Sequence, residues 1–485
     1  MLQTFFYIPD RLFGMPLFGW GLLLAIWAVA SVATLAYRIW RHGLGEEVLS
    51  YLPLLALIGA AIWFLLPSLE QVEHLPTGEN VMLGLPIRGY GVMLLIGLVS
   101  AVGLGVYRAK RRGIDPEIMY SLAIWLFIGG FGGARLFYVT EYWTQQFAKH
   151  HADGSFDFGA TLAAVANVAQ GGIVIYGGLA GGALAGALFL RRHRLPVLRI
   201  FDICAPSVMV GLAIGRIGCF LNGCCYGGVC ALPWAVAFPQ QSPPFERQMN
   251  RADAEGNRLY LHGLAFSDGA AGLGGPAVID KVLAGSAAER AGLKDDKEQI
   301  KKIDRQSSGD AKPVQVFPSK RRDGPGQGTV VEDDSLSAAE MALLSVSGEG
   351  TRILLRTDRG AETFEWTITA ADEPPLRSLY VHPTQLYSSL DAILLCLVLL
   401  AYEPFRRHDG ETLALLFILH PLARFLVEAI RTDEPKDYLK YFGGMSISQV
   451  GSLLFVAAAL ALWFYLRRQP VNVRSMAAAA RTATA

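Results

Sequence analysis

The stretch ICAPSVMVGLAIGRIGCFLNGCCYGG, residues 203–228, joins an apolar run to an arginine, an asparagine and three cysteines near its end. The run 203–221 is long and apolar enough to cross a hydrocarbon core of about 30 Å as a helix. Charged side chains are costly near hydrocarbon and usually mark function. The stretch therefore predicts a membrane-spanning helix that carries polar chemistry at one end.

The composition of the chain agrees with this prediction. Of its 485 residues, 52% are hydrophobic and only 18% are charged, whereas about a quarter of the residues of soluble proteins are charged. The net charge of +1 favours neither nucleic acid nor a strongly charged partner. The N-terminus lacks the features of a cleaved secretory signal, so we expect its first apolar run to be retained. The predicted fold class is an α-helical polytopic membrane protein.

Nine apolar stretches are long enough to be spans. Several are rich in glycine, such as YGGLAGGALAGALFL at 176–190, and small residues allow helices to pack closely in a membrane. We therefore expect a bundle rather than isolated anchors. The nine stretches lie near 15–37, 50–67, 89–106, 119–139, 172–190, 203–221, 385–402, 411–428 and 447–466.

The distribution of lysine and arginine predicts the orientation of these spans. Alternate connections are strongly basic, and cytoplasmic loops carry an excess of basic residues. The other connections would then face outward, with the N-terminus outside and the C-terminus in the cytoplasm. The basic connections contain Arg38 and Arg41, residues 107–113, residues 191–199, Arg406 and Arg407, and Arg467 and Arg468.

The charged residues concentrate in one polar stretch. Residues 241–378 contain 40 of the 85 Asp, Glu, Lys and Arg residues, so we expect an extracytoplasmic insertion between the sixth and seventh spans. Two N-terminal helices and a loop (1–82) precede a membrane core in two parts, 83–240 and 379–485.

Part of the insertion has the pattern of a small α/β module. The segment AVIDKVLAGSAAERAGLKDDKEQIKKID (277–304) predicts a strand, a turn, a short helix, a loop and a second strand. Together, segments 272–304 and 351–370 resemble a PDZ domain, which implies binding of an extracytoplasmic peptide or protein by strand addition. A spacer that keeps this shape without a ligand is the alternative. Residues 305–340 resemble a flexible excursion.

Polar side chains recur where six of the predicted spans meet the outer surface. Because the predicted orientation brings these ends to one level, we expect the side chains to share a site. They are Tyr90, Arg135, Tyr176, Arg216, Asn222, His382, Gln385, His420, Arg424, Glu428 and Arg431.

Three of these residues share one face of the eighth span. Arg424, Glu428 and Arg431 are separated by four and three positions, which places them on one helical face. Arginine suits the bidentate recognition of phosphate, so with Arg216 they predict a site for a lipid phosphate. The alternative is that these arginines merely extend their charged ends to the membrane–water interface and do not form a phosphate site.

Four motifs carry a specific resemblance. GRIGCFLNG (215–223), LPWAVAFP (232–239), HPTQLY (382–387) and RFLVEAIRTD (424–433) resemble bacterial prolipoprotein diacylglyceryl transferase in order and spacing, apart from the insertion. The resemblance implies that phosphatidylglycerol donates its diacylglyceryl group to the lipobox cysteine of a prolipoprotein signal peptide, forming a thioether and releasing glycerol phosphate. It implies no cofactor.

The resemblance also assigns roles to individual residues. Arg216 and Arg424 correspond to the family's essential arginines. Further correspondences are Tyr90, Asn222, Gly223, Gly227, Glu428 and Arg431, and we add Arg135, His382 and Gln385 as substrate-binding residues from their positions. Where the family commonly has a histidine this chain has Tyr176, and where a tyrosine is usual it has His420. We expect that this exchange keeps one proton acceptor near the incoming thiol.

The cysteines depart from the family's pattern. Cys219 replaces an asparagine and Cys224 a glutamate in the signature segment. The C-x4-CC-x4-C spacing of Cys219, Cys224, Cys225 and Cys230 lacks the paired CxxC motifs typical of zinc sites. We expect disulfides or plain packing, with a metal site or a catalytic thiol as alternatives.

The sequence also bears on two other functions. The chain contains neither HExxH nor GxSxG, which argues against an intramembrane protease. A non-catalytic lipid-binding or scaffold protein, which recruits partners through the PDZ-like domain, remains the alternative.

Overall fold

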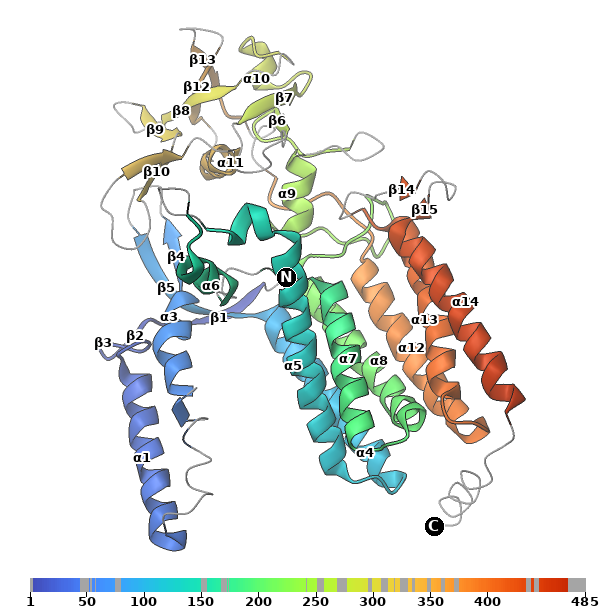
Figure 1. Cartoon of the computed structure of the whole chain (residues 1–485). Coiled ribbons are helices and arrows are strands. Elements are labelled where there is room, and N and C mark those ends of the chain that lie inside the picture. Colours follow the sequence, from blue (N-terminus) through green and yellow to red (C-terminus); the bar gives the residue numbers. More distant parts are fainter. Residues whose placement is uncertain are drawn as a thin grey trace.

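The computed structural model shows a helical bundle with a strand-rich domain beyond one end of it (Figure 1). It describes residues 3–43, 52, 55–56, 58–74, 80–149, 155–166, 172, 174–240, 242–250, 257–267, 277–294, 299–306, 313–317, 319–322, 330–333, 336–346, 350–358, 363–369, 375–432, 438–439 and 445–469.

Within the described residues, eight long helices form the membrane part. They are α1 (Leu22–His42), α4 (Gly89–Arg111), α5 (Pro116–Glu141), α7 (Ile175–Arg192), α8 (Val197–Asn222), α12 (Thr384–Tyr402), α13 (Glu411–Ile430) and α14 (Ile447–Arg468). Shorter helical segments are η1 (Ala61–Leu65), α3 (Leu66–Ser68), η2 (Trp143–Phe147), α6 (Phe158–Ala166) and η4 (Glu403–Phe405).

Seven of these helices are long and apolar enough to cross a membrane, within the described part of the chain. They correspond to the predicted first, third, fourth, sixth, seventh, eighth and ninth spans. The predicted fifth span is α7, a shorter helix packed along α5. The predicted second span, 50–67, lies partly outside the described residues, so the total of nine remains a prediction.

Glycines line the contact between α5 and α7, as the sequence predicts. A side chain on Gly133 would collide with the carbonyl oxygen of Gly177, and a side chain on Gly181 would collide with that of Gly129. The two backbones therefore approach as closely as glycine allows. Figure 1 shows the helices running side by side.

Replacing Gly133 by alanine is expected to lower the thermal unfolding midpoint of the purified protein, at a cost of about 1–3 kcal/mol for overpacking. Gly132→Ala is the matched control, because a side chain there meets no atom within 4 Å. The control should unfold close to the unsubstituted protein. Equal midpoints for the two variants would contradict the close contact of α5 with α7.

An N-terminal sheet leads into the bundle. Strands β1 (Thr4–Ile8), β5 (Asn80–Arg88) and β4 (Gln71–His74) pair antiparallel in the order β1-β5-β4, and β2 (Arg11–Leu12) pairs with β3 (Met15–Pro16). Because β5 ends at Arg88 and α4 begins at Gly89, this sheet fixes the start of α4.

The insertion contains its own hydrophobic core. A four-stranded antiparallel sheet has the order β13-β12-β8-β9, and Leu355 of β12 faces Ile303 of β8 and Phe364 of β13. The elements are α9 (Pro243–Asn250), β6 (Leu264–Ser267), β7 (Val278–Val282), α10 (Ala287–Arg290), β8 (Ile300–Gln306), β9 (Val314–Phe317), β10 (Ser319–Arg322), β11 (Val330–Asp333), α11 (Leu336–Ser345), β12 (Arg352–Thr357) and β13 (Thr363–Thr367).

The described elements follow the strand, helix and strand order predicted for 277–304. Ser286 caps α10 by accepting a hydrogen bond from the Glu289 amide at 3.2 Å. The assignment of this module to the PDZ class remains a prediction.

The prediction of a flexible excursion over 305–340 is wrong for part of that stretch. The side chain of Phe317 in β9 is fully buried in the insertion's core, and so is Ala339 in α11. The sequence did not reveal this contribution, because the apolar residues of this stretch are isolated among glycines and charged residues.

A short hairpin, β14 (Tyr438–Leu439) with β15 (Met445–Ser446), precedes α14. Ser446 then begins α14 with a reciprocal capping interaction with Gln449, which satisfies two free amides of the first turn. The last helix therefore starts at a defined residue.

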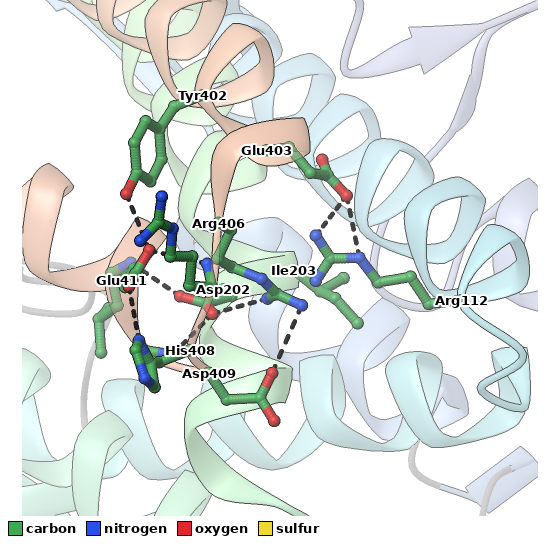
Figure 2. Close-up of polar contacts among 12 residues, drawn as sticks. Arg112, Asp202, Ile203, Tyr402, Glu403, Arg406, His408, Asp409 and Glu411 are labelled. Carbon is green, nitrogen blue, oxygen red and sulfur yellow. Dashed lines mark hydrogen bonds and ion pairs between the residues drawn. The ribbon is translucent and has the colours of Figure 1, made fainter. Parts of the chain in front are cut away.

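A polar network joins the helix ends farthest from the insertion (Figure 2). Asp202 of α8 is fully buried and accepts hydrogen bonds from the Arg406 side chain and from the amides of Gly410 and Leu413. Glu411 of α13 is also fully buried and accepts hydrogen bonds from His408 and Tyr402. Buried carboxylates of this kind are stable only when partners saturate them.

Glu403 adds a second contact between helices at this end. It forms ion pairs with Arg108 of α4 and with Arg112 just beyond α4. Arg108 also donates to the carbonyl of Ile203. The basic residues that predicted a cytoplasmic loop therefore also connect α4, α8, α12 and α13.

Candidate functional site

Four helices present polar residues at the bundle end nearest the insertion. Tyr90 lies in the first turn of α4, Arg216 is near the end of α8, Gln385 is in the first turn of α12, and Arg424 is near the end of α13. Figure 1 shows α8, α12 and α13 lying together on this side of the bundle. The convergence predicted from the sequence is present for these residues.

Glu428 lies between two arginines of the same helix end. Its carboxylate is 2.5 Å from a guanidinium nitrogen of Arg424 and 3.7 Å from one of Arg431. The side chains of Glu428 and Arg431 are 12% and 11% exposed, whereas that of Arg424 is 25% exposed. Glu428 therefore holds Arg424 by a charge-assisted contact, while the Arg424 side chain stays partly exposed.

Arg216 completes this group from α8. It interacts electrostatically with Arg424 and with Tyr90. Tyr90 packs against Gly218, where an added side chain would lie 3.2 Å from its ring. Two like charges that act on each other are unfavourable without a counterion, so this arrangement of Arg216 and Arg424 would suit an anion.

The loop after α8 is held by backbone and side-chain contacts. Gly223 ends α8 with a φ of 83°, in the left-handed region that favours glycine. The Gly227 amide donates to the His382 carbonyl at 2.9 Å, and an added side chain on Gly227 would lie 2.7 Å from the His382 Cβ. Gln385, fully buried, donates to the Cys224 carbonyl at 2.7 Å.

Two further predicted residues reach the same loop. The Asn222 side chain interacts with the Cys224 thiol, and the backbone carbonyl of Asn222 accepts a hydrogen bond from the Gln3 side chain of the N-terminal segment. The His382 ring lies 3.3 Å from the Tyr387 hydroxyl, which also accepts a hydrogen bond from the Trp234 indole. The N-terminal segment and the start of α12 thus both contact the end of α8.

His420 faces a carboxylate that the sequence analysis missed. Its Nδ1 lies 3.8 Å from a carboxylate oxygen of Asp391 in α12, a charge contact too long to be a hydrogen bond. Both side chains are partly exposed, at 33% and 27%, and His420 is one helical turn from Arg424. An acidic residue inside the predicted seventh span was the signal that could have identified Asp391.

Two predicted residues do not contribute a described side chain to this group. Arg135 is used elsewhere, because its guanidinium donates to the carbonyls of Ala164, Val165 and Gly172. It thereby holds the end of α6 and the approach to α7. Tyr176 lies in the first turn of α7, but its side chain is outside the described residues.

The six cysteines are free thiols, so the expected disulfides are not formed. A cluster of three thiols is formed by Cys219, Cys224 and Cys225, whose sulfur atoms lie within 4.8 Å of one another. Among the described residues, this is a group of side chains that could hold a metal ion. Cys230 is not a member of this group. Their spacing in the sequence argued against such a group, because the turn after α8 was not visible there.

Comparisons with known proteins identify one family. A sequence model of prolipoprotein diacylglyceryl transferase matches residues 79–264 and 336–465. A phosphatidylglycerol–prolipoprotein diacylglyceryl transferase of Rhodopirellula baltica is 33% identical over 487 residues, covering 96% of this chain and 89% of that protein.

Proteins of the same name in two cyanobacteria match shorter parts of the chain. The Acaryochloris marina protein is 36% identical over 199 residues, covering 41% of this chain and 65% of its own length. The Trichormus variabilis protein is 36% identical over 159 residues, covering 33% and 52% respectively.

Proposed function

Because this chain belongs to the prolipoprotein diacylglyceryl transferase family, we propose that Arg216 and Arg424 bind the phosphate of phosphatidylglycerol during the reaction. The chain is a transferase that moves the diacylglyceryl group of phosphatidylglycerol to the lipobox cysteine thiol of a prolipoprotein. A thioether forms and glycerol phosphate leaves. The names of the relatives support this activity and not a non-catalytic scaffold.

The observation that carries the proposed site is the ion pair of Glu428 with Arg424, together with the electrostatic interaction between Arg216 and Arg424. Substitution at the lipid carbon converts a phosphodiester with one negative charge into a phosphate monoester with up to two. Two guanidiniums held beside the phosphate stabilise this added charge in the transition state more than in the ground state.

The remaining predicted residues have supporting roles in this proposal. Tyr90 and Asn222 orient the headgroup, and Arg431 positions Glu428. Gly223, Gly227, His382 and Gln385 shape the loop that borders the site. Arg135 acts through the segment before α7, and Tyr176 stays a proposed catalytic residue on position alone.

His420 is the proposed proton acceptor for the incoming thiol. A free thiol has a pKa of about 8.5, so transfer near neutral pH benefits from a base and a positive field. Asp391 lies 3.8 Å from His420 and would stabilise the imidazolium once it forms. His420 is one turn from Arg424, which supports a place for the thiol next to the phosphate.

His420→Ala is expected to lower the rate of transfer by about 10²-fold, because general base catalysis commonly contributes at least that much. Asp391→Asn should lower it less, since Asp391 acts through His420. The measurement is diacylglyceryl transfer to a lipobox peptide by purified variants. His193→Ala is the control because His193 is exposed at the other end of the bundle. Undiminished transfer by His420→Ala would remove His420 as the base.

The protein is a membrane protein of the bacterial inner membrane. We propose that the N-terminus and the insertion face outward and that the C-terminus is cytoplasmic. The basic ends of α4, α7 and α14 support this orientation. They lie away from the insertion in Figure 1.

We propose a division of the chain into 1–82, the core segments 83–240 and 379–485, and the insertion 241–378. Binding of an extracytoplasmic peptide or protein by the PDZ-like segments 272–304 and 351–370 remains a prediction. It is separate from the transferase activity.

The deciding experiment is transfer by the purified protein to a peptide with a lipobox cysteine. Phosphatidylglycerol should support transfer, and phosphatidylethanolamine and a serine peptide should not. Mass spectrometry of the peptide and release of glycerol phosphate measure the two products together. A folded protein that releases glycerol phosphate without lipidating the peptide would contradict the proposed acceptor.

A further inference from the structure

The three clustered thiols lie close to the geometry of a metal site. The sulfur atoms of Cys219, Cys224 and Cys225 are within 4.8 Å of one another. Zinc binds thiolate sulfur at about 2.3 Å in a tetrahedron, which separates the sulfurs by about 3.8 Å. Small side-chain rotations would therefore close the triangle around one ion.

The backbone beneath these thiols is fixed in an unusual conformation. Cys225 has a φ of 60°, in the left-handed region that residues other than glycine seldom adopt. Side chains from the first turn of α12 hold it, because Thr384 donates to the Cys225 carbonyl and Gln385 donates to the Cys224 carbonyl. Contacts that hold the peptide groups of two ligands are what a preorganised metal site requires.

The cluster borders the anion site. Cys219 follows Arg216 by one helical turn, and Cys225 interacts electrostatically with Arg216 and Arg431. Tyr90 interacts with all three thiols and with Arg216. An ion bound by the cysteines would thus lie next to the phosphate that the arginines bind.

The balance of charge also suits zinc with a thiol substrate. A zinc ion with three thiolates carries one net negative charge, and a fourth thiolate makes it two. The two arginines near Cys225 offset this charge. Three protein ligands and a fourth position for water or substrate are typical of catalytic rather than structural zinc.

We propose that Cys219, Cys224 and Cys225 bind a zinc ion whose fourth ligand is the lipobox cysteine thiol of the prolipoprotein. This inference rests on the proposed function and names a device for activating the acceptor. Binding to zinc releases the thiol proton, because a coordinating thiol is deprotonated outright. His420 or water accepts that proton.

The transfer step is then balanced. The zinc-bound thiolate attacks the carbon of the diacylglyceryl unit that is bonded to the phosphate oxygen, and a carbon–sulfur bond forms as that carbon–oxygen bond breaks. The electron pair leaves with glycerol phosphate, whose added charge Arg216 and Arg424 neutralise. The thioether product is a weaker ligand than the thiolate, so the product leaves the zinc.

Metal binding is tested first on the full-length protein in detergent. After treatment with a chelator and re-addition of zinc, elemental analysis should find about one zinc per chain. Cys219→Ser, Cys224→Ser or Cys225→Ser should each weaken zinc binding by more than the 10- to 100-fold that loss of an outer partner costs. Cys230→Ser is the matched control and should bind zinc normally. A folded protein that binds copper(I) but not zinc would overturn the inference.

Cobalt(II) in place of zinc reports on the fourth ligand. Adding a lipobox cysteine peptide should strengthen the thiolate-to-cobalt absorption, and the serine peptide should not. This readout uses the unsubstituted protein and therefore does not depend on the folding of variants. If the cobalt spectrum did not change when the cysteine peptide was added, the role of zinc in binding the acceptor would be overturned.

Transfer assays separate the two proposals. The metal-free protein should lose transfer, and zinc should restore it. Full transfer without metal would overturn the zinc inference and leave the transferase intact. A zinc-loaded protein whose cobalt spectrum responds to the cysteine peptide, but which transfers nothing from phosphatidylglycerol, would overturn the proposed function instead.

Discussion

Replacing Arg216 by alanine is expected to lower diacylglyceryl transfer by about 10²- to 10³-fold, the usual effect of removing one preorganised transition-state donor. Arg216 of α8 interacts electrostatically with Arg424 and with Cys225 of the thiol cluster, and no other arginine is described near the end of α8. Arg216→Lys should recover only part of the loss, because an ammonium keeps the charge without bidentate geometry. The measurement is single-turnover transfer at saturating phosphatidylglycerol.

Arg407→Ala is the control for any general effect of removing an arginine from the protein. Arg407 lies at the opposite end of the bundle, where its backbone amide, rather than its side chain, bonds Glu411. This variant should transfer normally. If lysine at position 216 restored full activity, the site would need only a positive charge there and the bidentate role of Arg216 would be wrong.

Asp202→Ala is expected to destabilise the bundle by about 3–5 kcal/mol, because removing one partner of a buried ion pair leaves the other charge uncompensated. Asp202 is fully buried, and Arg406 lies 2.7 Å from it with 13% of its side chain exposed. Two backbone amides lose their acceptor as well. Thermal unfolding of the purified variants measures the effect.

Asp409→Ala provides the comparison within the same network. Asp409 lies 3.4 Å from Arg406 but is 30% exposed, so the loss should be at most about 1 kcal/mol. Equal destabilisation by the two variants would mean that burial of Asp202 does not decide the stability of this end. In Figure 2 both carboxylates flank Arg406.

The membrane helices were predictable because apolar length and loop charge are local properties of the sequence. Residues 203–221 alone specify most of α8. The contribution of Phe317 to the insertion's core was not predictable in this way, since it depends on pairing between β9 and β8. The sequence showed that Asp202 was present but not which amides it would meet, because Gly410 and Leu413 lie some 200 positions away.

The candidate site was predicted better than its surroundings. Helical spacing was enough to pair Arg424 with Glu428, and the structure confirms that pair. Asp391 was missed because its partner His420 is on another helix. In sequence, Arg135 resembled the other polar residues at the outer ends of the predicted spans. In the structure, however, its guanidinium donates to nearby backbone carbonyls. The thiol cluster depends on a left-handed residue at Cys225, a conformation that the residue type itself disfavours.

The insertion leaves and rejoins the bundle through a paired stem. Phe238 and Ser378 exchange hydrogen bonds at 2.8 Å and 2.9 Å, Pro239 pairs with Arg377, and Val236 pairs with Val381. The two chain segments of this stem therefore enter the bundle as a pair, as the two arms of a hairpin do. This holds whatever the length of the insertion between them. Doubling the length of a loop costs only about 0.6 kcal/mol in closure entropy. The separation of α8 and α12 thus does not depend on the size of the outer domain, which can be lengthened, shortened or exchanged without moving Arg216 or Arg424.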